Sequence, residues 1–322
     1  MRTKLKKTMK TNVIYRMMIA LLLVVGFASC SKDDDSPTDQ ATYNTKVYIT
    51  DGPIDNAEVQ GVFVTIADLK LNGKSVNGFT KTTVDLHALQ NGETQLLGDI
   101  DLAANTYNQV TLVLDPQRDA SGNSPANYVL TTNNDKIELT AENNTINVNS
   151  SFDITASTSN QVVIDFDLRK SIVTDAGNSG YNFATQTQLE SSIRVVNKLK
   201  AGAITGTATN NTGNSENITV AYAYAKGSFT ASEQNENAAG VRFSNAITSS
   251  RITGANNQFG LYFLTEGAYE LHFASYEDVD NDGVYEFDGM IETEGNLGLN
   301  LLDIPVNANT EVTLIVILLA IL

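Results

Sequence analysis

Residue types that mark several functional classes are scarce in this chain of 322 residues, which has one cysteine, two histidines and no tryptophan. The single cysteine, Cys30, excludes an internal disulfide. His87 and His272 fall in different halves of the chain, and nothing resembles a nucleophile elbow or a phosphate-binding loop. Catalysis therefore has little support, and stacking on sugars would depend on the 12 tyrosines and 12 phenylalanines.

The chain also lacks an apolar run long enough to span a membrane as a helix. Its first 16 residues carry six basic side chains and no acidic one, and 12 mostly apolar residues, Met17 to Ala28, follow. Twelve residues rise about 18 Å as a helix, against about 30 Å of hydrocarbon in a bilayer. This order predicts a secretory signal peptide over residues 1–29. A membrane anchor helix and a buried core helix are the alternatives.

The stretch FASC, at residues 27–30, ends this signal. It resembles the lipobox of bacterial lipoproteins, in which the cysteine becomes the acylated first residue of the mature protein. Ala28 and Ser29 fit that pattern, whereas Phe27 stands where leucine is usual. The resemblance implies that Cys30 is lipidated and anchors the protein in the outer membrane without a transmembrane helix.

Residues 30–44 are polar, have no apolar periodicity and are predicted to be a disordered acidic tether. In many lipoproteins of the Bacteroidetes, an acidic stretch directly after the lipidated cysteine directs export to the cell surface. The residues of similar character here are Ser31, Lys32, Asp33, Asp34 and Asp35. The alternative is that any polar tether would carry aspartate at these positions.

Removal of residues 1–29 makes the chain strongly acidic. Six of the 21 basic residues and none of the 37 acidic ones lie in the signal, so the mature chain has a net charge of about −22. Such a charge argues against nucleic acid as a partner and favours solubility and cation binding. A solvated acidic surface is the simpler explanation.

The remaining chain has the pattern of an all-β protein, with short alternating segments separated by asparagine, glycine and aspartate. The clearest predicted strands are 46–50, 62–66, 110–115, 162–168, 218–225, 261–264 and 269–276. Only Thr185 to Leu199 has a weak helical pattern, and residues 83–92 have room for one short turn. The predicted fold is two β-sandwich domains of Ig-like or transthyretin-like type.

The predicted domains are residues 45–198 and 200–322, because a strand pattern restarts at 202–214. The first resembles the family called domain of unknown function 4382, found in Bacteroidetes lipoproteins. Pieces that carry this resemblance include VYITDGPIDNAEV (47–59) and QVVIDFDLRKSIV (161–173). The family has no assigned biochemical role, so the resemblance implies a fold and a location but no activity.

The second domain resembles transthyretin-like or carboxypeptidase-regulatory-like sandwiches. The pieces that carry this resemblance are AGAITGTA (201–208), FGLYFLTEGAYELHFASYED (259–278) and VNANTEVTLIV (306–316). The resemblance implies a sandwich fold only.

One constellation suggests a calcium loop. In DVDNDGVYEFDG (278–289), three aspartates alternate before a glycine, as in the first half of a D-x-D-x-D-G loop. The position that is glutamate in an EF-hand is Gly289, so this is not an EF-hand. The alternative is a solvated turn between two strands. The candidate Ca²⁺ ligands are Asp278, Asp280, Asp282, Glu286 and Asp288.

A second carboxylate group lies in VVIDFDL (162–168), where Asp165 and Asp167 share one face of a strand with Val163. If the ITDGP segment is a neighbouring strand, Asp51 joins them and the three could converge on a cation. The alternative is a strand with one core face and one solvent face.

The last residues, VTLIVILLAIL (312–322), are apolar on both faces of a strand. They predict a buried final strand over 312–317, and the alternative is an exposed edge that pairs with a partner. For residues 318–322 the pattern predicts nothing definite.

Taken together, these features favour an outer-membrane, surface-exposed lipoprotein with a non-catalytic binding or structural role and an unknown protein or glycan ligand. The alternatives are a carbohydrate-binding accessory protein and a hydrolase that uses Asp51, Asp165 and Asp167.

Overall fold

The structure is a computed structural model of the whole chain. It describes residues 41–52, 59–157, 159–174, 180–214, 216–253, 256–280 and 283–322. All of them belong to one compact unit, Ala41–Leu322. Cys30 and the predicted signal, export and tether residues up to position 40 therefore lie outside the described residues. None of the described helices is long and apolar enough to cross a membrane.

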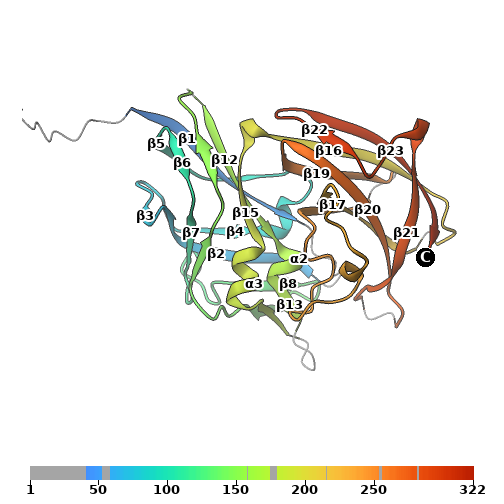
Figure 1. Cartoon of the computed structure of the whole chain (residues 1–322). Coiled ribbons are helices and arrows are strands. Elements are labelled where there is room, and N and C mark those ends of the chain that lie inside the picture. The colour runs from blue at the N-terminus through green and yellow to red at the C-terminus, as the bar shows by residue number, and fades with distance from the viewer. Residues whose placement is uncertain are drawn as a thin grey trace, which may run out of the picture. The chain divides into compact units, whose positions relative to one another are not determined.

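The described chain is nearly all β, as the sequence predicts (Figure 1). Two main sheets come from the part before residue 198, drawn blue to yellow-green in Figure 1. The first sheet has the order β15 (Ile193–Asn197), β12 (Asn160–Asp167), β1 (Thr42–Gly52), β5 (Gln95–Ala103). The second has the order β10 (Thr145–Val148), β7 (Val110–Leu114), β2 (Val59–Leu71), β8 (Tyr128–Thr131), β9 (Lys136–Glu138).

Shorter strands complete this part. β3 (Lys74–Ser75) and β4 (Thr82–Asp85) also pair with β2. Two separate two-stranded sheets are formed by β6 (Asn105–Tyr107) with β11 (Phe152–Ile154) and by β13 (Ile172–Thr174) with β14 (Tyr181–Phe183). The inward faces of the two main sheets share one apolar core, in which Ile49 and Phe166 of the first sheet meet Val64 and Ile66 of the second. This is the layering of a sandwich.

The part after residue 200 forms one eight-stranded sheet. Its order is β18 (Thr248–Arg251), β17 (Ile218–Ala225), β20 (Gly267–Glu277), β21 (Glu286–Gly295), β23 (Glu311–Ile321), β16 (Ala201–Asn210), β19 (Gln258–Thr265), with β22 (Ile304–Val306) on β20. The two end strands approach each other through the bridge Thr253↔Gln258 and a hydrogen bond from the Gly260 N–H to Ser250 Oγ. The sheet therefore curls over a core of its own.

Strand β17, ITVAYAYA, is buried on both faces. Its alanines Ala221 and Ala223 face the core inside the curled sheet. Its tyrosines Tyr222 and Tyr224 face a second cluster that the β17–β18 connection covers with Phe243. Small residues on one face and aromatic ones on the other let β17 serve both clusters.

All seven segments predicted as strands from alternation form strands, in β1, β2, β7, β12, β17, β19 and β20, and only Asp115 and Leu168 fall one residue beyond β7 and β12. The 83–92 turn is also confirmed as the 3₁₀ helix η2 (Leu86–Leu89). The helix predicted over Thr185–Leu199 is wrong for its second half. Helix α3 (Gln186–Ser191) ends early, and IRVVN continues as β15 because it pairs with β12. Its β-branched residues fit a pleated surface better than a helix.

Four short helices remain: α2 (Leu168–Ser171), η3 (Lys198–Lys200), η4 (Ala231–Gln234) and η5 (Asn296–Gly298). The Asn-Gly pairs Asn72–Gly73 and Asn91–Gly92 have positive φ at both residues, as asparagine and glycine in tight turns often do.

The C-terminal segment is an inner strand and not an exposed edge. β23 pairs in parallel with β16 over residues 311–318 and antiparallel with β21 over residues 316–321, so it lies between two strands of the sheet. The strand also continues through residues 318–321. The alternative of an edge open to a partner is therefore wrong for residues 316–318, which are paired on both sides.

Two neighbouring leucines test this placement. Leu318 is 1% exposed and belongs to the inner core, whereas Leu319 on the opposite face is 37% exposed. We expect Leu318→Ala to lower the free energy of unfolding by about 3 kcal/mol and Leu319→Ala by about 1 kcal/mol or less. Urea unfolding followed by circular dichroism measures both. Equal losses would contradict a β23 that buries the Leu318 face and exposes the Leu319 face.

Candidate functional site

The second carboxylate group lies where β1 and β12 run side by side. In their parallel register Asp51 lies opposite Phe166, between the pairs Thr50–Asp165 and Gly52–Asp167. Asp51 is close enough to both carboxylates of β12 for their charges to act on it. The three carboxylates are only 5–7% exposed. The face with Val163, Asp165 and Asp167 is therefore buried, contrary to the alternative that it faces solvent.

Arg194 neutralises the first of these carboxylates. It lies opposite Asp165 in the β12–β15 register, with its Nη2 2.5 Å from Asp165 Oδ2. The same guanidinium donates to two main-chain carbonyls of β19, through Nη1 to Phe263 O at 2.6 Å and Nη2 to Tyr262 O at 3.0 Å. A buried charge is stable only when it is paired and hydrogen-bonded, and both conditions hold for this guanidinium.

Asp167 is neutralised by two cations from the turn that follows it. Arg169 Nη2 is 3.1 Å and Lys170 Nζ 3.2 Å from Asp167 Oδ2. Arg169 Nη1 also donates to Arg242 O at 2.7 Å, and Lys170 Nζ donates to Ala246 O at 2.5 Å. We call Asp165, Asp167, Arg169, Lys170 and Arg194 the ionic cluster. Each of its cations joins a carboxylate from the first part of the chain to carbonyls from the second.

Asp51 lies beside the ionic cluster, and its pKa is shifted in the opposite direction from that of Asp167. Burial raises the pKa of Asp51 well above its usual range, and the charges of Asp167 and Asp165 raise it further. Its Oδ1 accepts a hydrogen bond from the Leu168 N–H at 3.1 Å. For Asp167, burial also acts to raise the pKa, but the charges of Arg169 and Lys170 outweigh it and hold the pKa below the usual range.

The space at these carboxylates is small. A cavity of about 10 Å³ is lined by Asp51, Asp165, Ser249 and neighbouring backbone, which is room for about one water. Asp51 Oδ2 and Ser249 Oγ have no hydrogen-bond partner among the described residues. No sugar ring fits in such a cavity, so the arrangement does not favour a glycoside hydrolase at Asp51, Asp165 and Asp167.

Tyr262 covers this cavity. Its ring lies against Gly92 at the Asn91–Gly92 turn, where an added Cβ would be 2.9 Å from the ring. The positive φ of Gly92, +82°, also requires glycine there. Close approach of this turn thus holds Tyr262 over the buried carboxylates.

In the predicted calcium loop, the described carboxylates bind neighbouring N–H groups. Asp278 Oδ2 accepts from the Gly283 N–H at 3.1 Å, Glu286 Oε2 from the Val279 N–H at 3.3 Å and Asp288 Oδ2 from Asn217 Nδ2 at 3.0 Å. Asp282 lies outside the described residues. Among the residues that are described, no three His, Cys, Asp or Glu side chains form a group that could hold a metal ion.

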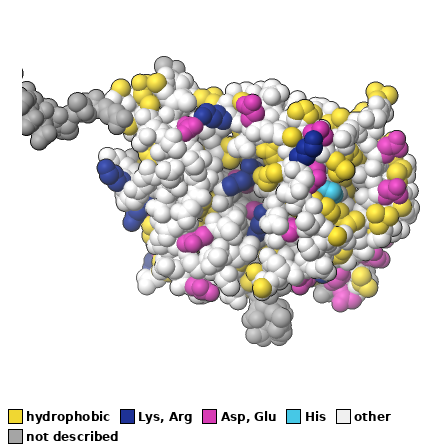
Figure 2. Space-filling view, viewed as in Figure 1, with side chains coloured by type: hydrophobic (Ala, Val, Ile, Leu, Met, Phe, Trp, Pro, Cys, Tyr) yellow, Lys and Arg dark blue, Asp and Glu magenta, His cyan; other side chains and the backbone are white. Residues whose placement is uncertain are grey.

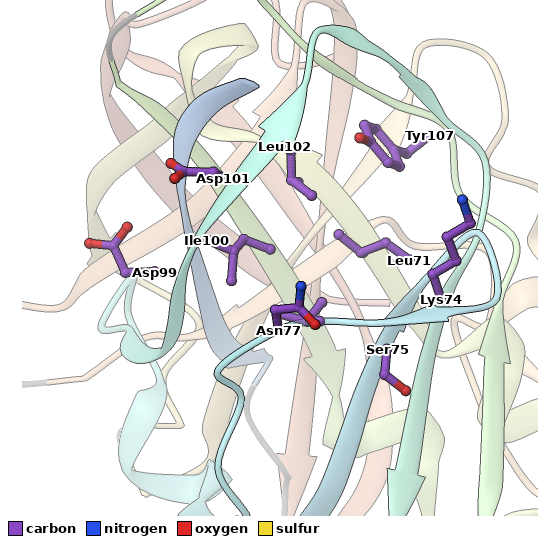
Figure 3. Close-up of a pocket in the computed structure, with 10 residues that line it drawn as sticks. Leu71, Lys74, Ser75, Asn77, Asp99, Ile100, Asp101, Leu102 and Tyr107 are labelled. Carbon is purple, nitrogen blue, oxygen red and sulfur yellow. The ribbon is translucent and has the colours of Figure 1, made fainter. Parts of the chain in front are cut away.

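The structure also contains a groove that the sequence does not predict. It lies between β5, the end of β2 and the β3 segment, and has a volume of about 450 Å³. Figure 3 shows Leu71, Ile100, Leu102 and Tyr107 converging on this space, while Asp99 and Asp101 point to the other side of β5. Lys74, Ser75, Val76 and Asn77 line the rest of the space, and Asp99 and Asp101 lie at its border on β5. The alternation of apolar and polar residues in QLLGDIDLA indicates a strand at β5, but it does not indicate a groove beside that strand.

Comparison with known proteins identifies the first part of the chain. Residues 44–185 match the family model called domain of unknown function (DUF4382), which confirms the resemblance for that segment. A comparison with curated proteins finds no match.

Solved structures resemble the chain only distantly. One is a leucine-rich repeat protein from Bacteroides thetaiotaomicron, with 10% identity, a TM-score of 0.20, and 85% of this chain but 25% of that chain covered. This chain therefore spans about a quarter of that protein. Another is the major pilin subunit BcpA of Bacillus cereus, with 10% identity and a TM-score of 0.20. The match covers 86% of this chain and 70% of BcpA. A third is a pilus-presented adhesin, with 9% identity and a TM-score of 0.22. The match covers 86% of this chain and 99% of the adhesin.

Two substitutions at the buried carboxylates should give opposite pH profiles. Because the pKa of Asp167 is lowered on folding, its carboxylate stabilises the fold above its unfolded pKa near 4, and this stabilisation is lost as the pH falls through the folded value. Asp167→Asn leaves two buried cations without their carboxylate. We expect this variant to lose about 3 kcal/mol of unfolding free energy at pH 7, and we expect the loss to become smaller below pH 4.

For Asp51, the change of stability with pH has the opposite sign. Because its pKa is raised on folding, its neutral form stabilises the fold at low pH, and this stabilisation is lost as the pH rises through the folded value. Asp51→Asn stays neutral and keeps an acceptor for Leu168. Its unfolding free energy relative to wild type should therefore rise with pH. Urea unfolding from pH 3.5 to 9 measures both variants, and parallel profiles would contradict the assignment.

Proposed function

We propose that this protein is a lipoprotein of the Bacteroidetes type, anchored in the outer membrane through Cys30, facing the cell surface and serving a binding or structural role. The sequence FASC after a signal peptide supports the anchor. The observation that carries the non-catalytic part is the ionic cluster, because its carboxylates are buried and neutralised by cations of the same chain.

The proposal includes two domains, at residues 45–198 and 200–322, the second of transthyretin-like type. Their strands belong to separate sheets, which supports this division. On the face shown in Figure 2, acidic and basic side chains are interspersed and do not gather into one basic patch. That distribution and the acidic sequence agree with a partner other than nucleic acid.

A glycan is the second candidate ligand, and a particular groove favours it. A space of about 520 Å³ on the second part is lined by Tyr262 and by hydroxyl, amide and carboxylate groups; these belong to Thr205, Thr207, Thr313, Gln258, Asn91 and Glu311. Tyr262 and Phe259 beside several polar groups form a composition that is typical of a sugar site. A glycan array would test this role, and Tyr262→Ala should abolish any signal that depends on the groove.

The anchor has a direct test. We expect radiolabelled palmitate to enter the wild-type protein in cells and Cys30→Ser to abolish the label, because the thiol is the acceptor. Protease treatment of intact cells should then degrade the wild-type chain. Unchanged labelling of Cys30→Ser would refute the anchor, and full protection from protease would place the chain on the inner leaflet.

The calcium hypothesis has a separate test. If the 278–289 loop binds Ca²⁺, millimolar calcium should raise the melting temperature by several degrees through preferential binding to the folded state. Asp280→Asn should abolish the rise, whereas Asp303→Asn, an exposed carboxylate in another loop, should retain it. An unchanged melting temperature of the wild-type protein in calcium would remove the hypothesis.

A further inference from the structure

Strand β5 is an edge of the four-stranded sheet. It pairs with β1 on one side, and no strand among the described residues pairs with its other side. An unpaired edge presents N–H and C=O groups to which a further strand can bond. β5 is nine residues long, whereas natural sheets often protect their edges by keeping them very short.

The groove described above lies along this edge and opens onto the core. Ile100 is 7% exposed and is part of the core cluster, and the partly buried Leu102 and Tyr107 pack against that cluster. Tyr107 is held in place by stacking on Phe152, with ring centroids 5.6 Å apart. At about 450 Å³, the groove is large enough for apolar side chains of an added strand.

The opposite face of β5 is acidic. Asp99 and Asp101 are exposed and point away from the groove (Figure 3). On the β1 side, Asp99 lies opposite Lys46 and accepts a hydrogen bond from Asn44 Nδ2 at 2.5 Å, while Asp101 lies opposite Asn44. On β1, therefore, only Lys46 carries a positive charge opposite the two aspartates. A strand on the other side would gain by bringing further positive charge.

We infer that the unpaired edge of β5 is a docking site for an extended segment of a protein partner in which apolar and basic residues alternate. Residues opposite each other on adjacent strands point to the same face. Partner residues opposite Ile100 and Leu102 therefore enter the groove and are apolar. Those opposite Asp99 and Asp101 are lysine or arginine. The inference rests on the proposed binding role but not on the lipid anchor.

The charges disfavour two nearer occupants. The segment at residues 31–40 of the same chain carries four aspartates and one lysine, so it would meet Asp99 and Asp101 with like charge. A second copy of this chain, with its net charge of −16, brings general repulsion as well. A basic, strand-forming segment of another protein satisfies both the acidic face and the apolar groove.

Peptide binding to the full chain in detergent tests the inference. The probes are an eight-residue peptide of alternating valine and lysine and its valine–glutamate counterpart, each with a fluorescent label. We expect the wild-type protein to prefer the lysine peptide by about tenfold. The double substitution Asp99→Lys with Asp101→Lys should reverse that preference. Leu102→Trp, which fills the groove, should weaken binding of the lysine peptide by about tenfold.

The matched control is Glu292→Lys with Glu294→Lys. These two exposed residues have the same spacing on β21, in the stretch Ile291–Gly295 that pairs with β23, and neither of them lines the groove beside β5. The control changes the net charge equally and should leave the preference of wild type intact. If the control reverses the preference as well, or if wild type binds neither peptide, the inference is overturned. A wild-type dimer that the Asp99/Asp101 reversal dissociates would assign the edge to a second copy and also overturn it.

These outcomes are independent of the proposed anchor. Failure of peptide binding with palmitate labelling intact at Cys30 would remove the docking site and leave the proposed function standing. Peptide binding with no palmitate label would remove the anchor and leave the docking site.

Discussion

The interaction on which the rest of the fold depends is the pairing of buried carboxylates on β12 with cations that also bind carbonyls from the second part of the chain. Asp165 and Asp167 could not be buried as isolated charges, because the desolvation cost would be several kcal/mol for each. Arg169 and Lys170 outweigh that cost for Asp167, and Arg194 offsets part of it for Asp165, whose pKa is still raised by burial. The same cations bind carbonyls of β19 and of the β17–β18 connection. Neutralising the carboxylates thus also determines where these two segments lie.

That placement has a consequence inside the second part. The segment held by Arg169 and Lys170 carries Phe243, which stacks on Tyr222 with ring centroids 4.4 Å apart. The guanidinium of Arg169 itself lies 5.4 Å from the Tyr222 ring. The aromatic face of β17 is therefore covered by a segment that the ionic cluster positions. No residue of the ionic cluster lines the groove beside β5. Binding at that edge can vary without disturbing the buried charges.

Much of the fold could be predicted from the sequence because strand alternation is a local signal, and the seven clearest segments all form strands. The features that could not be predicted depend on pairing between distant segments. Strand β15 was not predicted because its sequence, IRVVN, directly follows a short helix. It forms a strand because it pairs with β12. The inner position of β23 requires a parallel partner, β16, more than a hundred residues earlier. No local pattern encodes such a pairing, since its stability comes from contacts made after the sheet assembles.

The burial of the aspartates on β12 was also difficult to predict from the local sequence. Charged residues at alternate positions ordinarily indicate a solvent face, and this is correct for Asp99 and Asp101 on β5 but wrong for Asp165 and Asp167 on β12. The difference lies in the residues directly after each pair of aspartates: DFDLRK supplies two bases within three residues of Asp167, whereas DIDLAA supplies none. Adjacent bases let a carboxylate be buried within its own chain, so the sequence did contain a signal for Asp167. Arg194 leaves no such signal, because it meets Asp165 only across strands. Acids without nearby bases remain at the surface, where their charge is available to a partner.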